Sequence, residues 1–328
     1  MATYKEINGT NIQVVSSDPS NPVEGQLWYN STSNTVKGFI VSAGSWATGG
    51  AMNTARNSLG SAGTTQAAAL GFGGDTNAPT MPADTESYNG TAWTEVNNLN
   101  TGRQALGGAG TNTAALAFGG GLAFPPGGPT AITESWNGSN WTEVNDMNTA
   151  RTYFGSAGAT NTACLAFGGD PVTTITENWN GTNWTEVNDL NTQRDLLAGN
   201  GTNTSALAYG GETPSATAAT ESWNGTNWTS VNSMNTVRRR LAGAGASNTS
   251  GLAFAGKISL GPDPVTGATE SWNGSNWTEV GDMSVAREYL GSSGTNSSAL
   301  GFGGNIPPST TSTEEFSSGP ATVTLTTS

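Results

Sequence analysis

The residues of this chain that could do chemistry are an arginine and a glutamate that recur together six times. The arginines stand 43–49 residues apart, and a glutamate follows each of them after 26–32 residues. They are Arg56, Arg103, Arg151, Arg194, Arg238 and Arg287, followed by Glu86, Glu134, Glu177, Glu221, Glu270 and Glu314. Six arginines in a ring could bind a polyanion. The favoured interpretation is structural, in which each guanidinium braces a loop by bonding backbone carbonyls or the recurring carboxylate.

Histidine chemistry is excluded, and cysteine chemistry rests on one residue. The 328 residues include no His, and Cys164 is the only cysteine. Cys164 occupies a position that other repeats fill with Ala or Gly, so we expect a small buried side chain without nucleophilic or disulfide chemistry. A carboxylate-only glycosidase remains formally open. Because the glutamates recur in every repeat, whereas catalytic groups usually break a repeat, we expect no enzyme, cofactor or metal.

The charge of the chain limits its partners. Its formal net charge is −13, which disfavours nucleic acid and anionic membranes, although solvation of a large surface explains the charge more simply. The only cationic cluster, residues 238–240, is weak evidence for a phosphate or sulfate contact. Residues 1–5 lack the pattern of a signal peptide, so we expect none, and no apolar run approaches the roughly 18 residues of a membrane helix. Membrane insertion and classical secretion are therefore not expected, but export on a particle stays open.

Each arginine opens a repeat of four short strands. An apolar segment follows it and ends at a Gly pair, or at Ala255-Gly256 in the fifth repeat. The recurring glutamate comes next, with an aromatic two residues on, and a Trp follows an Asn-Gly turn, as in residues 136–141. Asn-Gly supplies the positive φ of a tight hairpin. The repeat length is that of a propeller blade, so we predict an all-β, six-bladed β-propeller.

The order of these elements resembles the kelch repeat family. The Gly pair, the aromatic, the Trp and the following Arg recur in fixed order over residues 45–316. The departures are Ala255 in place of a glycine and Phe316, which no Trp follows. The resemblance implies a six-bladed kelch-like propeller, while the kelch-type copper oxidases are excluded because their metal site needs His.

The missing last Trp suggests how the ring closes. Trp46 precedes the first Arg and matches the outer-strand position, so the N-terminal strand is expected to complete the last blade and remove an open edge. The six outer positions are then Trp46, Trp93, Trp141, Trp184, Trp228 and Trp277. We expect the Gly-, Ala- and Ser-rich strands after each Arg to line the centre, and the aromatics to pack between neighbouring sheets.

One face of this propeller varies from blade to blade. The loops after the Gly pairs differ in length and composition, whereas those on the opposite face are nearly identical. Variable loops on a rigid scaffold are the usual place for binding, but loops also drift where nothing constrains them. The candidate ligand-binding residues are Phe124, Pro125, Pro126, Asp170, Glu212, Arg239 and Asp263.

Residues 1–44 stand outside the repeat as an N-terminal arm, and residues 317–328 form a C-terminal tail. Residues 26–30 and 35–40 are predicted to form a β-hairpin around residues 31–34. The stretch 22–31, PVEGQLWYNS, resembles segments of tailed-phage structural proteins, including fibre and appendage proteins. The resemblance implies an arm that anchors the chain to other virion proteins, with Leu27, Trp28, Tyr29, Phe39 and Ile40 as the anchoring residues.

These expectations describe a non-enzymatic bacteriophage virion protein. It would be made in the host cytoplasm and exposed outside on the particle. Two roles on the particle are nearly tied. One is attachment to a host or glycan as a tail fibre component, and the other is decoration of the capsid or tail. A stand-alone soluble lectin-like or protein-interaction propeller is the alternative. The sequence leaves open a homo-oligomer, and no coiled-coil heptads support a trimeric fibre.

Overall fold

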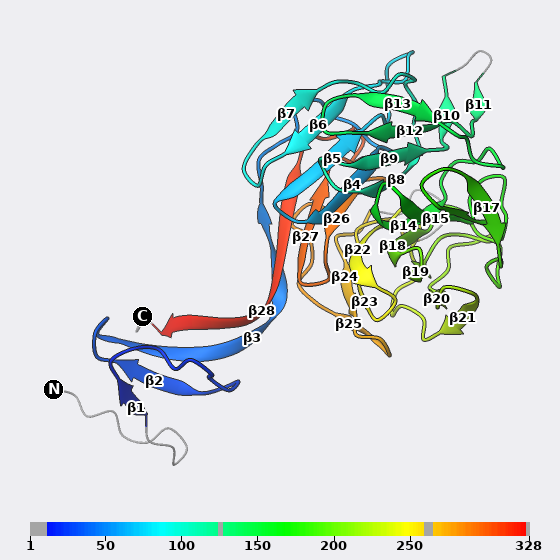
Figure 1. The fold of residues 1–328 in the computed structure, drawn as a ribbon. Coiled ribbons are helices and arrows are strands. Elements are labelled where there is room, and N and C mark those ends of the chain that lie inside the picture. Colours follow the sequence, from blue (N-terminus) through cyan, green and yellow to red (C-terminus); the bar gives the residue numbers. More distant parts are fainter. Residues whose placement is uncertain (1–11, 124–126, 259–264, 326–328) are drawn as a thin grey trace. The chain divides into compact units, whose positions relative to one another are not determined.

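A computed structural model describes residues 12–123, 127–258 and 265–325 of the chain, and these residues form strands and turns without a helix (Figure 1). Among them, therefore, no helix is long and apolar enough to cross a membrane. The chain divides into two compact units. Residues 46–317 form the repeat domain, and residues 1–45 together with 318–328 form the end domain.

Five four-stranded antiparallel sheets correspond to the first five repeats. The first contains β4 (Gly60–Thr65), β5 (Ala68–Phe72), β6 (Thr85–Tyr88) and β7 (Trp93–Val96). The second contains β8 (Gly107–Gly110), β9 (Ala115–Phe118), β12 (Thr133–Trp136) and β13 (Trp141–Val144). The third contains β14 (Gly155–Thr160), β15 (Ala163–Phe167), β16 (Thr176–Trp179) and β17 (Trp184–Val187). The fourth contains β18 (Ala198–Thr202), β19 (Ser205–Tyr209), β20 (Thr220–Trp223) and β21 (Trp228–Val231). The fifth contains β22 (Ala242–Ser247), β23 (Ser250–Phe254), β24 (Thr269–Trp272) and β25 (Trp277–Glu279).

The sixth repeat contributes to a larger sheet of order β1-β2-β3-β28-β27-β26. Its own strands are β26 (Gly291–Gly294), β27 (Ser298–Phe302) and β28 (Thr313–Leu325). The strand beside β28 is β3 (Thr35–Thr48), which carries Trp46. A separate two-stranded ribbon, β10 (Gly121–Leu122) with β11 (Gly128–Pro129), lies in the variable loop of the second repeat. The sheets repeat as predicted and are compatible with a β-propeller.

The Asn-Gly turns form the predicted hairpins. In the second repeat, Trp136 pairs with Trp141, and the side-chain oxygen of Asn137 accepts the backbone N–H groups of Ser139 and Asn140, both at 2.9 Å. Gly138 lies between them with φ 91°, a conformation that glycine adopts without steric cost. The same bonds recur around Asn180, Asn224 and Asn273.

The Gly pairs are needed because the next repeat approaches closely. Gly73 has φ 61°, and a Cβ placed on it would lie 2.4 Å from the carbonyl oxygen of Arg103. In the fifth repeat Ala255 replaces this glycine and still adopts φ 62°. The fold therefore imposes the left-handed conformation even where the sequence departs from the pattern.

Aromatic side chains pack between neighbouring sheets, as predicted. Phe72 of the first sheet meets Trp141 of the second at 5.0 Å between ring centroids. The Trp141 indole N–H also donates to Thr85 Oγ1, at 3.2 Å. All six outer tryptophans repeat this bond to a threonine of the preceding sheet: Trp93 to Thr313, Trp184 to Thr133, Trp228 to Thr176, Trp277 to Thr220 and Trp46 to Thr269.

The predicted hairpin forms in the end domain. There β2 (Leu27–Asn30) pairs antiparallel with β3 through residues 27–30 and 35–38, and β1 (Gln13–Val15) lies parallel to β2. One carboxylate joins these elements. Asp18 accepts hydrogen bonds from the Trp28 indole, the Asn30 amide and the Lys37 ammonium at 2.7–3.0 Å. The bonds from Lys37 and then Asn30 are the main reason that its pKa falls to about 2.

Candidate functional site

The recurring arginines are structural, which confirms the favoured interpretation. Each is fully buried and forms an ion pair of 2.7–3.3 Å with the glutamate of its own repeat. In the first repeat the guanidinium of Arg56 also donates to the carbonyl oxygens of Gly73 and Asp84, at 2.9 and 2.6 Å. Burial lowers the pKa of these arginines, while the paired glutamates oppose that effect. Six buried and paired guanidiniums do not offer a polyanion site.

The recurring glutamates are equally occupied. Glu134 accepts from Arg103 through one oxygen and from the backbone N–H of Asn100 through the other, at 2.7 Å in both cases. The Asn100 side chain adds a second bond to that oxygen at 2.8 Å. Each pair therefore fastens the chain entering a repeat to the third strand of that repeat's sheet.

The single thiol is also structural. Cys164 is fully buried on β15, and this burial raises its thiol pKa well above the usual value. A thiol that stays protonated is a poor nucleophile. The position therefore serves packing, as predicted. Within the residues that the structure describes, no cluster of three or more His, Cys, Asp or Glu side chains could hold a metal ion.

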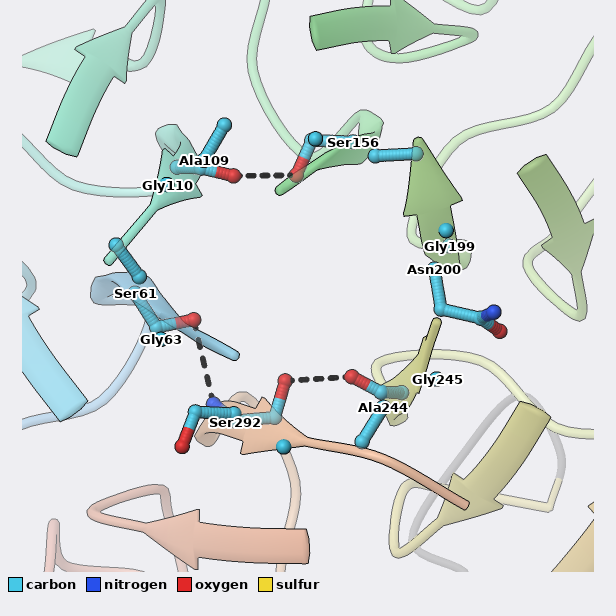
Figure 2. A pocket seen from close by; sticks show the side chains of 18 residues that line it. Ser61, Gly63, Ala109, Gly110, Ser156, Gly199, Asn200, Ala244, Gly245 and Ser292 are labelled. Atoms are coloured by element: carbon cyan, nitrogen blue, oxygen red, sulfur yellow. Dashed lines mark hydrogen bonds between the residues drawn. The ribbon is translucent and has the colours of Figure 1, made fainter. Parts of the chain in front are cut away.

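The first strands of the repeats enclose an inner cavity of about 90 Å³ (Figure 2). Three residues from each of β4, β8, β14, β18, β22 and β26 line it, almost all Gly, Ala or Ser. Two serines link these strands: Ser156 donates to the carbonyl of Gly108 and Ser292 to that of Gly243, at 3.1 and 2.8 Å. This volume suits a few waters rather than a ligand, since small-molecule pockets measure roughly 300–1,000 Å³.

A ring of backbone hydrogen bonds surrounds one end of these strands. The residue two positions after each recurring Arg donates its N–H to the carbonyl of its counterpart in the preceding repeat, at 2.7–3.1 Å. The ring passes through Ser58, Ala105, Tyr153, Leu196, Arg240 and Tyr289. It closes because the N–H of Ser58 donates to the carbonyl of Tyr289. We call these six residues the rim. With the residues that follow them they line a second cavity of about 110 Å³, the rim cavity.

All rim residues have left-handed backbones, with φ between 51° and 57°. Glycine adopts this conformation freely, whereas bulky residues rarely do and pay of order 1–3 kcal/mol. Tyr153 and Tyr289 meet across the rim at 5.5 Å between ring centroids. The guanidinium of Arg240 lies 4.7 Å from the Tyr289 ring centre and pairs with Glu288 at 3.1 Å. Burial is the main cause of the raised pKa of both tyrosines.

The variable loops begin at this rim. The residue before each rim residue forms a β-bridge with the first residue of its repeat's variable loop. These bridges are Asn57–Asp75, Gln104–Gly121, Thr152–Asp170, Asp195–Glu212, Arg239–Lys257 and Glu288–Asn305. The rim cavity and the variable loops thus share one face of the repeat domain.

Among the carboxylates of this face that the structure describes, Asp195 has the most perturbed pKa. It is 8% exposed, and its Oδ1 has no hydrogen-bond partner among the described residues. Desolvation, followed by the charges of Glu212 and Asp170, raises its pKa to about 6. A buried carboxylate oxygen without a donor is costly and often marks a functional position.

The predicted ligand-binding residues fall into three groups. Asp170 is exposed at the start of its loop, whereas Glu212 and Arg239 form a 2.6 Å ion pair beside the rim. Arg239 and Arg240 each pair with a carboxylate, which leaves little free charge for a phosphate or sulfate. Phe124, Pro125, Pro126 and Asp263 lie outside the described residues.

The predicted anchoring residues differ in exposure. Trp28 is fully buried in the end domain, Leu27, Tyr29 and Phe39 are half-buried, and Ile40 is 42% exposed. Trp28 is thus part of the domain's own core rather than a surface contact.

Sequence reasoning missed Tyr153, Tyr289 and Asp195. The signal was present in the two residues after each recurring Arg, which change from repeat to repeat while their surroundings stay constant. Comparison with protein-family models gives no match for this chain, and comparison with curated proteins gives none either. Its function is therefore inferred from its own residues.

Proposed function

We propose that this chain is a non-enzymatic bacteriophage virion structural protein that displays a closed six-bladed, kelch-like propeller on the particle surface. The observation that carries the proposal is the division of the chain into a repeat domain and a separate end domain built from both chain ends. Such a division suits a protein that is held by one part and presents the other.

Closure of the propeller is supported by two sets of six hydrogen bonds. The backbone bonds of the rim pass through all six repeats and return to the first. The indole bonds do the same, because Trp46 on β3 bonds the fifth sheet while Trp93 of the first repeat bonds Thr313 of the sixth. The first strands also follow one another, with β26 contacting both β22 and β4. Within the sixth sheet β3 lies beside β28, so it covers the edge that β28 would otherwise leave open.

The end domain would be the anchor to other virion proteins. Its surface carries exposed apolar side chains at Val14, Val23 and Ile40. Trp28 and the Asp18 network would hold the domain together rather than touch the particle. Ile40 is therefore the best candidate contact among the anchoring residues.

Adhesion is favoured over decoration by one observation. The face that carries the variable loops also carries the rim, where bulky side chains occupy strained backbone positions. A coat that only stabilises a particle has no need of such side chains. A stand-alone lectin-like or protein-interaction propeller remains the second candidate, since the same face would serve it equally.

Cryo-electron microscopy of the native particle tests the proposal. We expect propeller density at a tail tip, fibre or appendage, with the variable loops pointing outward and the end domain inward. Density repeated over the capsid or tail wall would replace adhesion with decoration. Particles without the propeller would overturn the virion role and leave the stand-alone propeller.

A further inference from the structure

The sheet of the end domain has two different faces. It consists of β1, β2, the first part of β3 and the last part of β28 (Figure 1). In the hairpin Trp28 lies opposite Lys37. Its neighbour Tyr29 lies opposite Val36, on the other face, because side chains alternate along a strand. Val14 of β1 pairs with Tyr29 and therefore shares its face.

The chain itself covers the face that carries Trp28. Asp18, in the segment between β1 and β2, accepts hydrogen bonds at 2.7–3.0 Å from the side chains of three residues, Trp28, Asn30 and Lys37. The three donors therefore lie on the same side of the sheet, as the alternation requires. Trp28 is fully buried there. The segment that carries Asp18 thus provides the second layer that a sheet face normally packs against.

The opposite face is apolar and uncharged, and we call it the apolar face. Along β1, β2 and β3 it carries Val14, Leu27, Tyr29, Val36, Gly38 and Ile40. Val14 is 68% exposed and Ile40 is 42% exposed, while Leu27, Tyr29 and Val36 are half-buried. Adjacent apolar side chains that remain exposed on one sheet face are typical of an interaction surface.

The distribution of charge along the chain favours a second copy as the partner of the apolar face. The end domain contains two lysines and three acidic residues, a net charge of −1, so −12 of the total of −13 belongs to the repeat domain. The repeat domains of two copies therefore repel each other. Two copies can approach through the uncharged apolar face at the least electrostatic cost. They also match in shape, because sheets with the same twist pack face to face about 10 Å apart.

We propose that the end domains of two copies pair through the apolar face in a two-fold symmetric dimer. Such a contact uses the same patch on both copies, so Val14 and Ile40 of each copy become buried. Removal of their exposed apolar surface from water drives the association. The pairing rests on the proposed function of the end domain as the anchor and names the partner of its anchoring face. The contact of Ile40 is then with a second copy, and the particle carries the propellers in pairs.

The test is the mass of the full chain in solution, measured by sedimentation equilibrium at micromolar concentration. We expect a dimer, with twice the 33.3 kDa of one chain. Added salt should strengthen the dimer, because it screens the repulsion between the repeat domains. Ile40→Asp places a charge on the apolar face and should raise the dissociation constant at least tenfold. Val14→Asp should do the same, and the parent side chain is too exposed for its replacement to prevent folding.

The matched control is Val172→Asp. Val172 is as exposed as Ile40, at 42%, but it lies in the repeat domain, so this variant should remain a dimer. A parent chain that is monomeric or trimeric would overturn the pairing. A dimer that survives both Ile40→Asp and Val14→Asp, or that Val172→Asp disrupts equally, would also overturn it. None of these results decides the virion role, which microscopy of the particle tests independently.

Discussion

The indole N–H of Trp46 donates a hydrogen bond of 3.1 Å to Oγ1 of Thr269, a residue 223 positions further along the chain. Trp46 lies on β3, beside β28, whereas Thr269 belongs to the fifth sheet. The Trp46 ring is also part of the hydrophobic core, because its centroid lies 4.8 Å from that of Phe254 and 5.3 Å from that of Phe316. A segment that precedes the first repeat thus fills the outer position of the last one.

Removing one partner of a buried ion pair should strongly destabilise its repeat. Replacing Glu134 by Gln leaves the guanidinium of Arg103 buried without a counter-charge. Breaking one side of such a pair costs about 3–5 kcal/mol. We expect Glu134→Gln to lower the free energy of unfolding by that amount in urea denaturation.

The matched control is Glu143→Gln, on the same hairpin. Glu143 is exposed and lies opposite Glu134 across the β12–β13 pairing. Its removal should change stability by less than about 0.5 kcal/mol. Equal effects of the two variants would show that leaving Arg103 without its counter-charge costs no more than losing a surface charge.

In the core of the repeat domain, a larger residue at Asn200 is matched by a smaller one at Gly251. Other repeats place Ala or Ser at the Asn200 position and Ala or Cys at the Gly251 position. A Cβ on Gly251 would lie 2.8 Å from Asn200 Oδ1. We expect Gly251→Ala to destabilise by about 1–3 kcal/mol through overpacking.

Adding Asn200→Ala to Gly251→Ala should recover most of that loss, because the double variant restores the small pair of the other repeats. The comparison is a double-mutant cycle of unfolding free energies. Additive effects would mean that the two side chains do not share the space.

Asp195 should make stability depend on pH. Its folded pKa of about 6 lies above the unfolded value near 3.9, so the folded state holds the proton more tightly. The resulting stabilisation is fully present below about pH 4 and is lost as pH rises through 6.

Asp195→Asn removes that titration. The variant should be more stable than the parent at pH 8, by on the order of 1–2 kcal/mol, and the advantage should disappear near pH 4. Chemical denaturation at the two pH values measures the difference. An advantage of equal size at both values would rule out a raised pKa as its cause.

The repeat pattern predicted more of the fold than of the site. The Asn-Gly turns, the Gly pairs and the Arg–Glu spacing each dictate local backbone geometry, so the four strands of a repeat follow from residues close in sequence. The Trp46 position could be predicted because it completes a periodic series. The rim could not, because its hydrogen bonds join residues that are each more than 40 positions apart, such as Ala105 and Ser58. Nor does any local pattern mark Tyr153 and Tyr289 as meeting across the rim.

In the end domain, prediction from the sequence has a different limit. The hairpin at residues 26–40 follows from local alternation and its turn. The extension of β3 to Thr48, and the pairing of this strand with β28, depend on a partner some 270 residues away. The three bonds to Asp18 likewise come from residues 10–19 positions further on.

Closure of the ring through Trp46 is the claim on which the rest depends, and a double-mutant cycle between Trp46 and Thr269 tests it most directly. Trp46→Phe removes the indole N–H and Thr269→Val removes the acceptor, while the Trp141→Phe and Thr85→Val cycle measures the same bond inside the ring. We predict coupling energies of about 0.5–1.5 kcal/mol that agree between the two cycles. A coupling near zero for Trp46 and Thr269, beside a normal value for Trp141 and Thr85, would contradict the closed propeller.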